Sequence, residues 1–218
     1  MKTRERIISS VIDAFNEKGY HSFSLAELAQ KCNMSRGNLA YHYKYKEDIL
    51  DDISVKMVRD INRFLKRRMD YPAFYNLNLD IRTCRFLQEK YPFVFRDMTI
   101  LEHDSIKEVL TKWSKEVIKR NLNAFAYGIE IENVKPEPYA GLYYQLSVNA
   151  WLITYNWLAQ NYVREIGDLE KAERMVWSTI IPHFTEKGMD AFLNYYGKDF
   201  ISNFGIPIKQ YMELKHLF

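Results

Sequence analysis

The chain has 218 residues and a formal net charge of +3 at pH 7. Hydrophobic residues make up 47% and charged residues 27%, which excludes a disordered tail, a collagen and a low-complexity linker. The small net charge excludes a bulk polycationic mode of nucleic-acid binding, so any contact with DNA must come from a local patch. Glycine (8) and proline (6) are scarce, which favours an all-helical fold of one or two domains.

The location of the protein is predicted from its cysteines, its N-terminus and one uncharged stretch. Cys32 and Cys84 are too few for a disulfide scaffold or a four-thiolate zinc site. The charged, amphipathic N-terminus lacks an export signal, so we expect a cytoplasmic protein. Residues 138–163 carry no charge and are long enough to span a bilayer. Their repeated amides would be costly in lipid, so we expect a buried helix and no membrane contact.

The first 46 residues are predicted to form a three-helix head. Apolar residues recur with helical spacing over residues 4–18, and Gly19 follows where a left-handed C-terminal cap belongs. A capping box opens a second, short helix over residues 24–31. Asn33 then lies in a tight turn, where it can take a positive φ, and a third helix follows over residues 35–43.

A longer helix is predicted from Lys46 to about Met69. It would join the head (1–46) to a helical body (47–218) that prolines and glycines divide into further helices. Pro182 is expected to kink the last long helix because it removes a backbone donor. The predicted body helices cover residues 73–90, 92–101, 104–127, 138–162 and 168–196.

Residues 24–43 have the order helix, short turn, helix that is typical of a helix-turn-helix motif. A helix with its side chains fits the major groove of B-DNA, which is about 12 Å wide. Between Ser35 and Lys46 there is no acid, while Arg36, Lys44 and Lys46 supply positive charge. An ordinary helical hairpin with a solvated basic face is the alternative.

Residues 7–50 resemble the DNA-binding head of the tetracycline-repressor (TetR) family of transcription regulators. The resemblance implies an all-α fold, in which a helix-turn-helix head is joined by a long helix to a body that binds a ligand and dimerises. It covers about a fifth of the chain, and the likeness beyond it is architectural only. The matching residues are Phe15, Gly19, Tyr20, Ser24, Leu28, Ala29, Ser35, Arg36, Gly37, Asn38, Leu39, His42, Tyr43, Lys46 and Glu47.

The resemblance also implies a set of DNA contacts. It assigns a phosphate-contacting helix cap to Ser24 and a groove-facing helix start to residues 35–38. Two positions depart from the family pattern, since Ala40 replaces a phosphate-binding tyrosine and Asn33 replaces the usual turn glycine. Tyr41 could substitute for the missing tyrosine. The candidate DNA-binding residues are Ser24, Ser35, Arg36, Gly37, Asn38, Tyr41, His42, Lys44 and Lys46.

The chemistry of these side chains suggests a division of labour. Arg36 can pair with a guanine and Asn38 with an adenine, each pair giving about 1–3 kcal/mol of discrimination. Lys44 and Lys46 would supply affinity through counterion release without reading sequence. Arg36 and Asn38 could instead be ordinary solvated side chains, and we interpret Tyr43 as a core residue.

A single recognition helix binds weakly, so we expect a homodimer on a palindromic operator of double-stranded DNA. The half-sites of such an operator lie about 34–36 Å apart. The helices that begin near residues 138 and 168 are the candidate interface, because their apolar and uncharged faces are wide. The residues expected in the dimer interface are Val176, Ile180, Phe184, Gly188 and Ala191.

The aromatic side chains of the body suggest a cavity for a hydrophobic or planar small molecule, with core packing as the alternative. No cofactor is expected. The consecutive Glu102, His103 and Asp104 are not expected to bind a metal, because they point apart on a helix. The expected ligand-binding residues are Phe86, Phe93, Trp113, Tyr144, Gln145, Asn149, Trp151 and Tyr155.

The sequence lacks the motifs of phosphate-binding loops, zinc proteases and serine hydrolases, and its five histidines are scattered. We therefore interpret the chain as a non-enzymatic, ligand-responsive DNA-binding regulator. It would be a repressor that a hydrophobic or aromatic small molecule releases from its operator. An effectorless architectural DNA-binding dimer is the alternative that the sequence leaves open.

Overall fold

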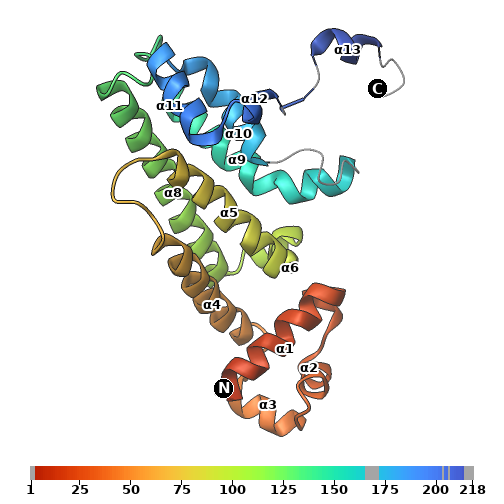
Figure 1. Ribbon diagram of the computed structural model, residues 1–218. Helices are drawn as coiled ribbons and strands as arrows, with labels where there is room; N and C mark the ends of the chain where they lie inside the picture. Colours follow the sequence, from red (N-terminus) through yellow and green to blue (C-terminus); the bar gives the residue numbers. More distant parts are fainter. Residues whose placement is uncertain (1–2, 165–171, 203, 206, 214–218) are drawn as a thin grey trace.

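The computed structural model describes residues 3–164, 172–202, 204–205 and 207–213, and over these ranges the expected all-helical fold is confirmed. The head lies at one end of an elongated molecule, and the helices of the body extend away from it (Figure 1). The elements are α1 (Thr3–Lys18), η1 (Tyr20–Ser22), α2 (Leu25–Lys31), α3 (Arg36–His42), α4 (Asp48–Leu65), α5 (Phe74–Lys90), α6 (Pro92–Arg96), α7 (Met98–Leu101), α8 (Asp104–Glu130), α9 (Leu142–Arg164), α10 (Ala172–Ile180), η2 (Ile181–His183), α11 (Glu186–Tyr196), α12 (Asp199–Ser202) and α13 (Ile208–Glu213).

The head helices begin and end where local signals place them. Ser24 and Glu27 form the expected capping box at the start of α2. The Ser35 hydroxyl accepts a hydrogen bond from the Asn38 N–H (3.1 Å) and caps α3. Asn33 takes a φ of 54° in the turn between α2 and α3, as expected for this residue type. These predictions are therefore confirmed in detail.

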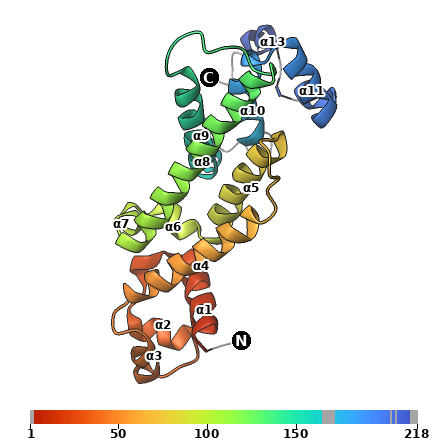
Figure 2. The same cartoon turned by 90° about the vertical axis from the view of Figure 1, so that its left-hand side faces the viewer.

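Helix α4 runs from the head into the body, where it packs against α5 and α8 (Figure 2). It ends at Leu65 rather than at the predicted Met69. The side chain of Asn76 explains this end, because it accepts a hydrogen bond from the Met69 N–H (3.0 Å) and donates to the carbonyls of Met69 (3.1 Å) and Tyr71 (2.9 Å). The backbone groups of Met69 therefore have partners outside a helix.

The last long helix of the prediction is two helices. Helix α10 ends at Ile180, a 3₁₀ turn containing Pro182 follows, and α11 begins at Glu186. Proline cannot supply the donor that a continuous helix needs, so the predicted kink is a complete break. The predicted break at Gly167 and the predicted helix start at Asp168 lie outside the described residues.

Two hydrophobic clusters fill the molecule. The lower core runs from α1 through α4 to the first part of α8, and it includes Ile7, Met57 and Leu87. The upper core joins α9, α10 and α11 to the end of α8, and it includes Phe125 and Trp177. The head thus shares its core with the lower body, while the far end of the body has a core of its own. Among the described helices, none combines the length and the apolar character needed to cross a bilayer.

Candidate nucleic-acid interface and body cavity

Helix α3 exposes most of its surface. Within the helix only Leu39 is buried, and this side chain packs into the lower core. Tyr41, two residues further along, is 86% exposed. One buried side chain therefore anchors a helix whose other residues are accessible, which is the geometry needed to enter a DNA groove.

The first turn of α3 presents the two candidate base-reading residues. Arg36 and Asn38 are exposed, and within the described residues their side chains take part in no ion pair or hydrogen bond. Gly37 between them is exposed as well, and apart from the adjoining backbone of α3 no described atom lies within 4 Å of the place that a Cβ would take. The guanidinium and the amide are thus available to a ligand in solution.

The residues after α3 add cationic and aromatic groups to the same end. Lys44 is exposed, and its ammonium lies 5.1 Å from the centre of the Tyr45 ring. The half-buried ring of His42 stands edge-on to Tyr41 at 5.4 Å. Tyr45 is 56% exposed and was not among the predicted contacts. Its position as an aromatic residue between two lysines in a turn was the signal that could have found it.

Two predicted contact residues also have partners within the head. The Lys46 ammonium donates to the carbonyls of Tyr20 (3.2 Å) and Phe23 (3.1 Å), and it lies 4.0 Å from the centre of the Tyr20 ring. An ammonium has three donors, so one remains for a phosphate. The exposed Ser24 hydroxyl donates to the Glu27 carboxylate (2.7 Å). Both residues therefore stabilise the head as well as facing solvent.

Tyr43 is a core residue, as expected. Its side chain is buried, its hydroxyl donates to Asp52 on α4 (2.6 Å), and the Arg4 guanidinium donates to the same hydroxyl (3.3 Å). Burial and the hydrogen bond to Asp52 raise the pKa of Tyr43 far above its usual value, so the hydroxyl remains a donor. The contact fixes the end of α3 against α1 and α4.

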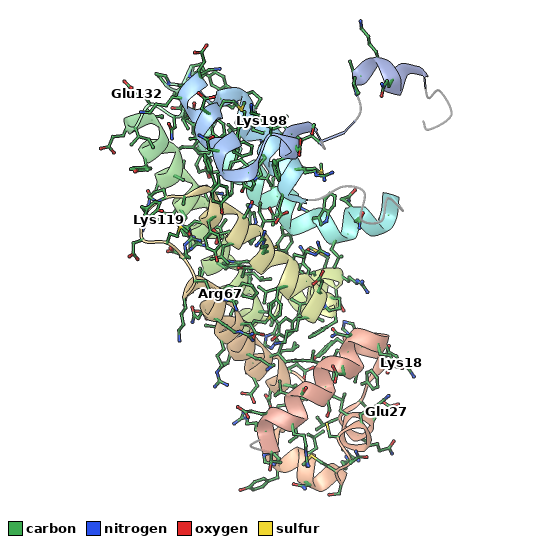
Figure 3. The ribbon with its side chains drawn as sticks, in the orientation of Figure 1. Lys18, Glu27, Arg67, Lys119, Glu132 and Lys198 are labelled. Carbon is green, nitrogen blue, oxygen red and sulfur yellow. The ribbon has the colours of Figure 1, made fainter. Side chains whose placement is uncertain are left out.

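The far end of the body contains a cavity of about 400 Å³. This volume falls within the range of about 300–1,000 Å³ that is typical of ligand pockets. Its walls come from the segment between α4 and α5 with the start of α5, from the second half of α8 and the loop after it, and from α9, α10 and α11. None of the described lining residues carries a charge. Glu132, which follows α8, lies at the opposite end of the molecule from Glu27 of the head (Figure 3).

The expected ligand-binding residues lie elsewhere in the body. None of the eight lines this cavity. Phe86, Phe93, Trp113, Trp151 and Tyr155 pack in or against the lower core, because helices α5, α6, α8 and α9 close around them. Tyr144, Gln145 and Asn149 are exposed on α9. Aromatic content correctly suggested a cavity in the body but did not identify the rings that form it.

The residues expected in the dimer interface lie inside the protomer or against the cavity. Val176, Ile180, Phe184 and Gly188 are buried within the protomer, and Ala191 lines the cavity. Gly188 faces the chain itself, since a Cβ there would lie 1.8 Å from the Asn133 carbonyl oxygen. The apolar row on α10 and α11, expected to face a partner, packs within the protomer. On α10 it packs against α9 and α5, and on α11 Gly188 lies against the loop after α8.

Comparisons with known proteins agree with the geometry of the head. The family model described as "Bacterial regulatory proteins, tetR family" matches residues 7–53. The transcriptional regulator UidR of Escherichia coli K12 is 34% identical over 65 residues, which are 30% of this chain and 32% of UidR. The chain therefore matches only about a third of the length of this curated relative.

The fold of the whole chain is that of solved TetR-type structures. A TetR-family transcriptional regulator from Marinobacter aquaeolei superposes with a TM-score of 0.75 at 23% identity, over 89% of this chain and 97% of that one. AibR in complex with isovaleryl coenzyme A and operator DNA superposes with a TM-score of 0.55 at 16% identity. The superposition covers 71% of this chain and 85% of AibR. The chain is an all-helical protein with a helix-turn-helix head. Its head thus matches the model of the TetR family of bacterial regulatory proteins, and its overall fold is shared with the solved TetR-type structures.

Proposed function

We propose that this protein is a homodimeric, DNA-binding transcriptional repressor that acts in the cytoplasm. Residues 1–46 would bind a palindromic operator, and residues 47–218 would dimerise and bind a hydrophobic or aromatic effector that releases the DNA. The observation that carries the proposal is the exposed α3, at whose start the side chains of Arg36 and Asn38 have no partner among the described residues. The match of residues 7–53 to the family model and the operator complex of the structurally similar AibR support it.

Protection of DNA upstream of the protein's own gene tests the DNA-binding part. Arg36→Ala should relax base preference by about 1–3 kcal/mol at one position of each half-site. Lys119→Ala is the matched control, because Lys119 is an exposed cation on α8 far from α3 (Figure 3). The control should bind like the wild type. Equal behaviour of the two variants, or no protection of any fragment at low salt, would contradict the proposal.

The exposed face of α9 is the surface we propose for dimerisation. Leu152 is 48% exposed on this face, and Val163 is 71% exposed. The exposed residues on this face follow helical spacing and carry no charge, so two copies could pack without burying an ion. The set is Gln145, Asn149, Leu152, Asn156, Gln160 and Val163.

Light scattering of Leu152→Glu tests this face. The variant should dissociate into monomers, because the dimer would bury the new carboxylate without a partner. Val55→Glu is the control, since Val55 on α4 is also 48% exposed and lies outside the proposed interface. Dissociation of both variants, or of neither, would place the interface elsewhere.

A continuous set of contacts joins the cavity to the head. Met69 lines the cavity, and the preceding Arg68 pairs with Asp80 on α5 (2.9 Å). Helix α4 ends a turn before Arg68, and near its other end Asp52 holds Tyr43. A ligand that displaces the segment after α4 would thus move α4 and, with it, the end of α3. A coupling of about 1–3 kcal/mol would weaken DNA binding about 5- to 150-fold.

The effectorless architectural dimer remains the second candidate function. It predicts that no small molecule changes both the thermal stability of the protein and its affinity for DNA. The cavity favours a sensor, because an uncharged space of this volume would lower stability in a protein that had no use for it. A compound that raises the melting temperature and releases DNA would exclude the architectural alternative.

A further inference from the structure

We infer that the groove between α1 and α4 is a binding site for a small organic phosphate, separate from the cavity in the body. The groove has a volume of about 460 Å³, which falls within the range of about 300–1,000 Å³ that is typical of ligand sites. It lies where α1 of the head packs against α4. Three cations line it, Arg4 from α1 and Lys56 and Arg59 from α4.

Lys56 faces this groove without a counter-charge. The carboxylates four residues from it on α4 are Asp52 and Asp60, and both are engaged elsewhere. Asp52 accepts a hydrogen bond from the Arg4 guanidinium, and Asp60 accepts one from the Lys90 ammonium (2.6 Å). Within the described residues, the half-buried Lys56 side chain takes part in no ion pair or hydrogen bond. Its ammonium is therefore available to an anion.

Arg59 is a second cation without a partner among the described residues, and it is exposed. The positions three and four residues from it on α4 hold no acid, since they are occupied by Val55, Lys56, Asn62 and Arg63. Like charges at this spacing repel each other. The helix dipole does not account for Lys56 and Arg59, because its effect is confined to the end turns and both residues lie in the middle of α4. A bound anion would remove the repulsion.

Arg4 brings the third cation from the opposite wall of the groove. Its Nε–H donates to Asp52 and to the Tyr43 hydroxyl (3.3 Å). A guanidinium has five N–H donors, so four remain on the terminal nitrogens, and no described residue accepts from them. The side chain is 59% exposed, which leaves these donors accessible. Because Asp52 and Tyr43 already hold the guanidinium, little ordering is needed when a ligand binds.

The groove also adjoins the contacts that anchor α3. The Tyr43 hydroxyl at the end of α3 donates to Asp52 (2.6 Å), and Asp52 lines the groove together with Arg4. A ligand held by Arg4 would therefore bind next to the side chains that fix the end of α3. The cavity in the body, by contrast, lies at the far end of the molecule.

A phosphate monoester matches these three cations. At neutral pH it carries nearly two negative charges and offers three oxygens, and guanidinium groups bind such oxygens through two parallel N–H bonds. Glu5 and Ser9 also line the groove, are exposed, and have no partner among the described residues. Their oxygens can accept hydrogen bonds from hydroxyl groups. The phosphate is thus expected on a compound with several hydroxyls. A phosphodiester of duplex DNA carries only one charge and fits the three cations less well.

Calorimetry on the full chain without DNA tests this inference, at pH 8, low ionic strength and in a phosphate-free buffer. The probes are ribose 5-phosphate, ribose and inorganic phosphate. Ribose 5-phosphate should bind about 2- to 10-fold more tightly than inorganic phosphate, because only its hydroxyls can reach Glu5 and Ser9. Ribose should not bind. No binding of ribose 5-phosphate, binding of ribose, or equal affinity for the two phosphates overturns the inference.

Two substitutions assign the binding to the groove. Arg59→Gln should weaken the binding of ribose 5-phosphate about tenfold, because it removes charge-assisted hydrogen bonds. Arg63→Gln is the matched control, since Arg63 is an exposed arginine one turn further along α4, outside the groove and without a partner among the described residues. Equal effects of the two substitutions would overturn the site.

Both variants should bind DNA like the wild type. Weaker DNA binding by Arg59→Gln alone would assign these cations to the DNA backbone and would also overturn the inference. A failure of ribose 5-phosphate to bind, beside intact DNA binding, would remove the groove site and leave the proposed repressor function untouched.

Discussion

The two ends of the molecule are built in opposite ways. At the head, α3 is convex and exposed, and its supporting polar groups are paired with each other, as Tyr43 is with Asp52. At the far end the candidate site is concave, and among the described residues the Asn121 side chain and the Oδ1 atom of Asn133 have no hydrogen-bond partner. A surface that reads DNA can be specified by one short segment, whereas a cavity depends on segments that meet only in the folded chain.

The largest expected effect lies between the two ends, at a buried carboxylate. Asp80 is 4% exposed and accepts hydrogen bonds from Arg68 (2.9 Å) and Arg120 (2.8 Å), which come from the segment after α4 and from α8. Asp80→Asn should lower the free energy of unfolding by about 3–5 kcal/mol, because it leaves two largely buried guanidinium groups without a counter-charge. Denaturation in urea measures the change.

The control for this prediction is an exposed ion pair on α8. Glu108 pairs with Lys112, and both side chains are mostly exposed. Glu108→Gln should leave the free energy of unfolding unchanged within the error of the measurement, because solvent screens an exposed ion pair. Equal effects of the two substitutions would mean that Asp80 does not connect α4 to the body.

Replacing a glycine by alanine should change the free energy of unfolding in opposite directions at the two ends of the molecule. Gly188→Ala should lower the stability by about 1–3 kcal/mol, because the new Cβ collides with the Asn133 carbonyl. Gly37→Ala in α3 should raise it by about 0.5–1 kcal/mol, since the site is open and alanine favours a helix. Urea denaturation of both variants measures these changes. A stabilising effect of Gly188→Ala would show that α11 does not lie against the Asn133 carbonyl.

The head could be predicted from sequence because its signals are local. Ser24 is three residues from its capping partner, and Asn33 and Ser35 act on the turn and helix beside them. The end of α4 could not be predicted, because it depends on Asn76, seven residues further on from Met69. Helical spacing predicted most of the body helices. It did not predict which neighbouring helix covers each face.

The cavity residues could not be predicted for the same reason. Phe184 belongs to a row that helical spacing marks as apolar, but the spacing does not say whether a partner subunit or the protomer itself covers it. The structure pairs its backbone with Val134 in an isolated β-bridge. This contact joins residues 50 positions apart and closes the far end of the body. Contacts between residues far apart in the sequence thus determine which surface covers this apolar row, and helical spacing does not reveal them.

The last comparison concerns the reactivity of two thiols, Cys32 in the head and Cys84 in the body. Burial raises the pKa of Cys32 in the head and of Cys84 in α5, so both stay largely protonated. Each should react with a thiol reagent at pH 8 at least about tenfold more slowly in the native protein than in urea, because the thiolate is the reactive form. Fast native labelling of either thiol would show that its region opens readily.

Selection from a library of random DNA duplexes tests the central claim most directly, because it requires no knowledge of the operator. We expect enrichment of a palindrome whose half-sites lie about 34–36 Å apart. When the selection is repeated with Arg36→Ala, the preference for one guanine in each half-site should disappear while the rest of the motif persists. Recovery of unenriched DNA at low salt, or an unchanged motif with Arg36→Ala, would contradict the account of α3 as the element that reads DNA.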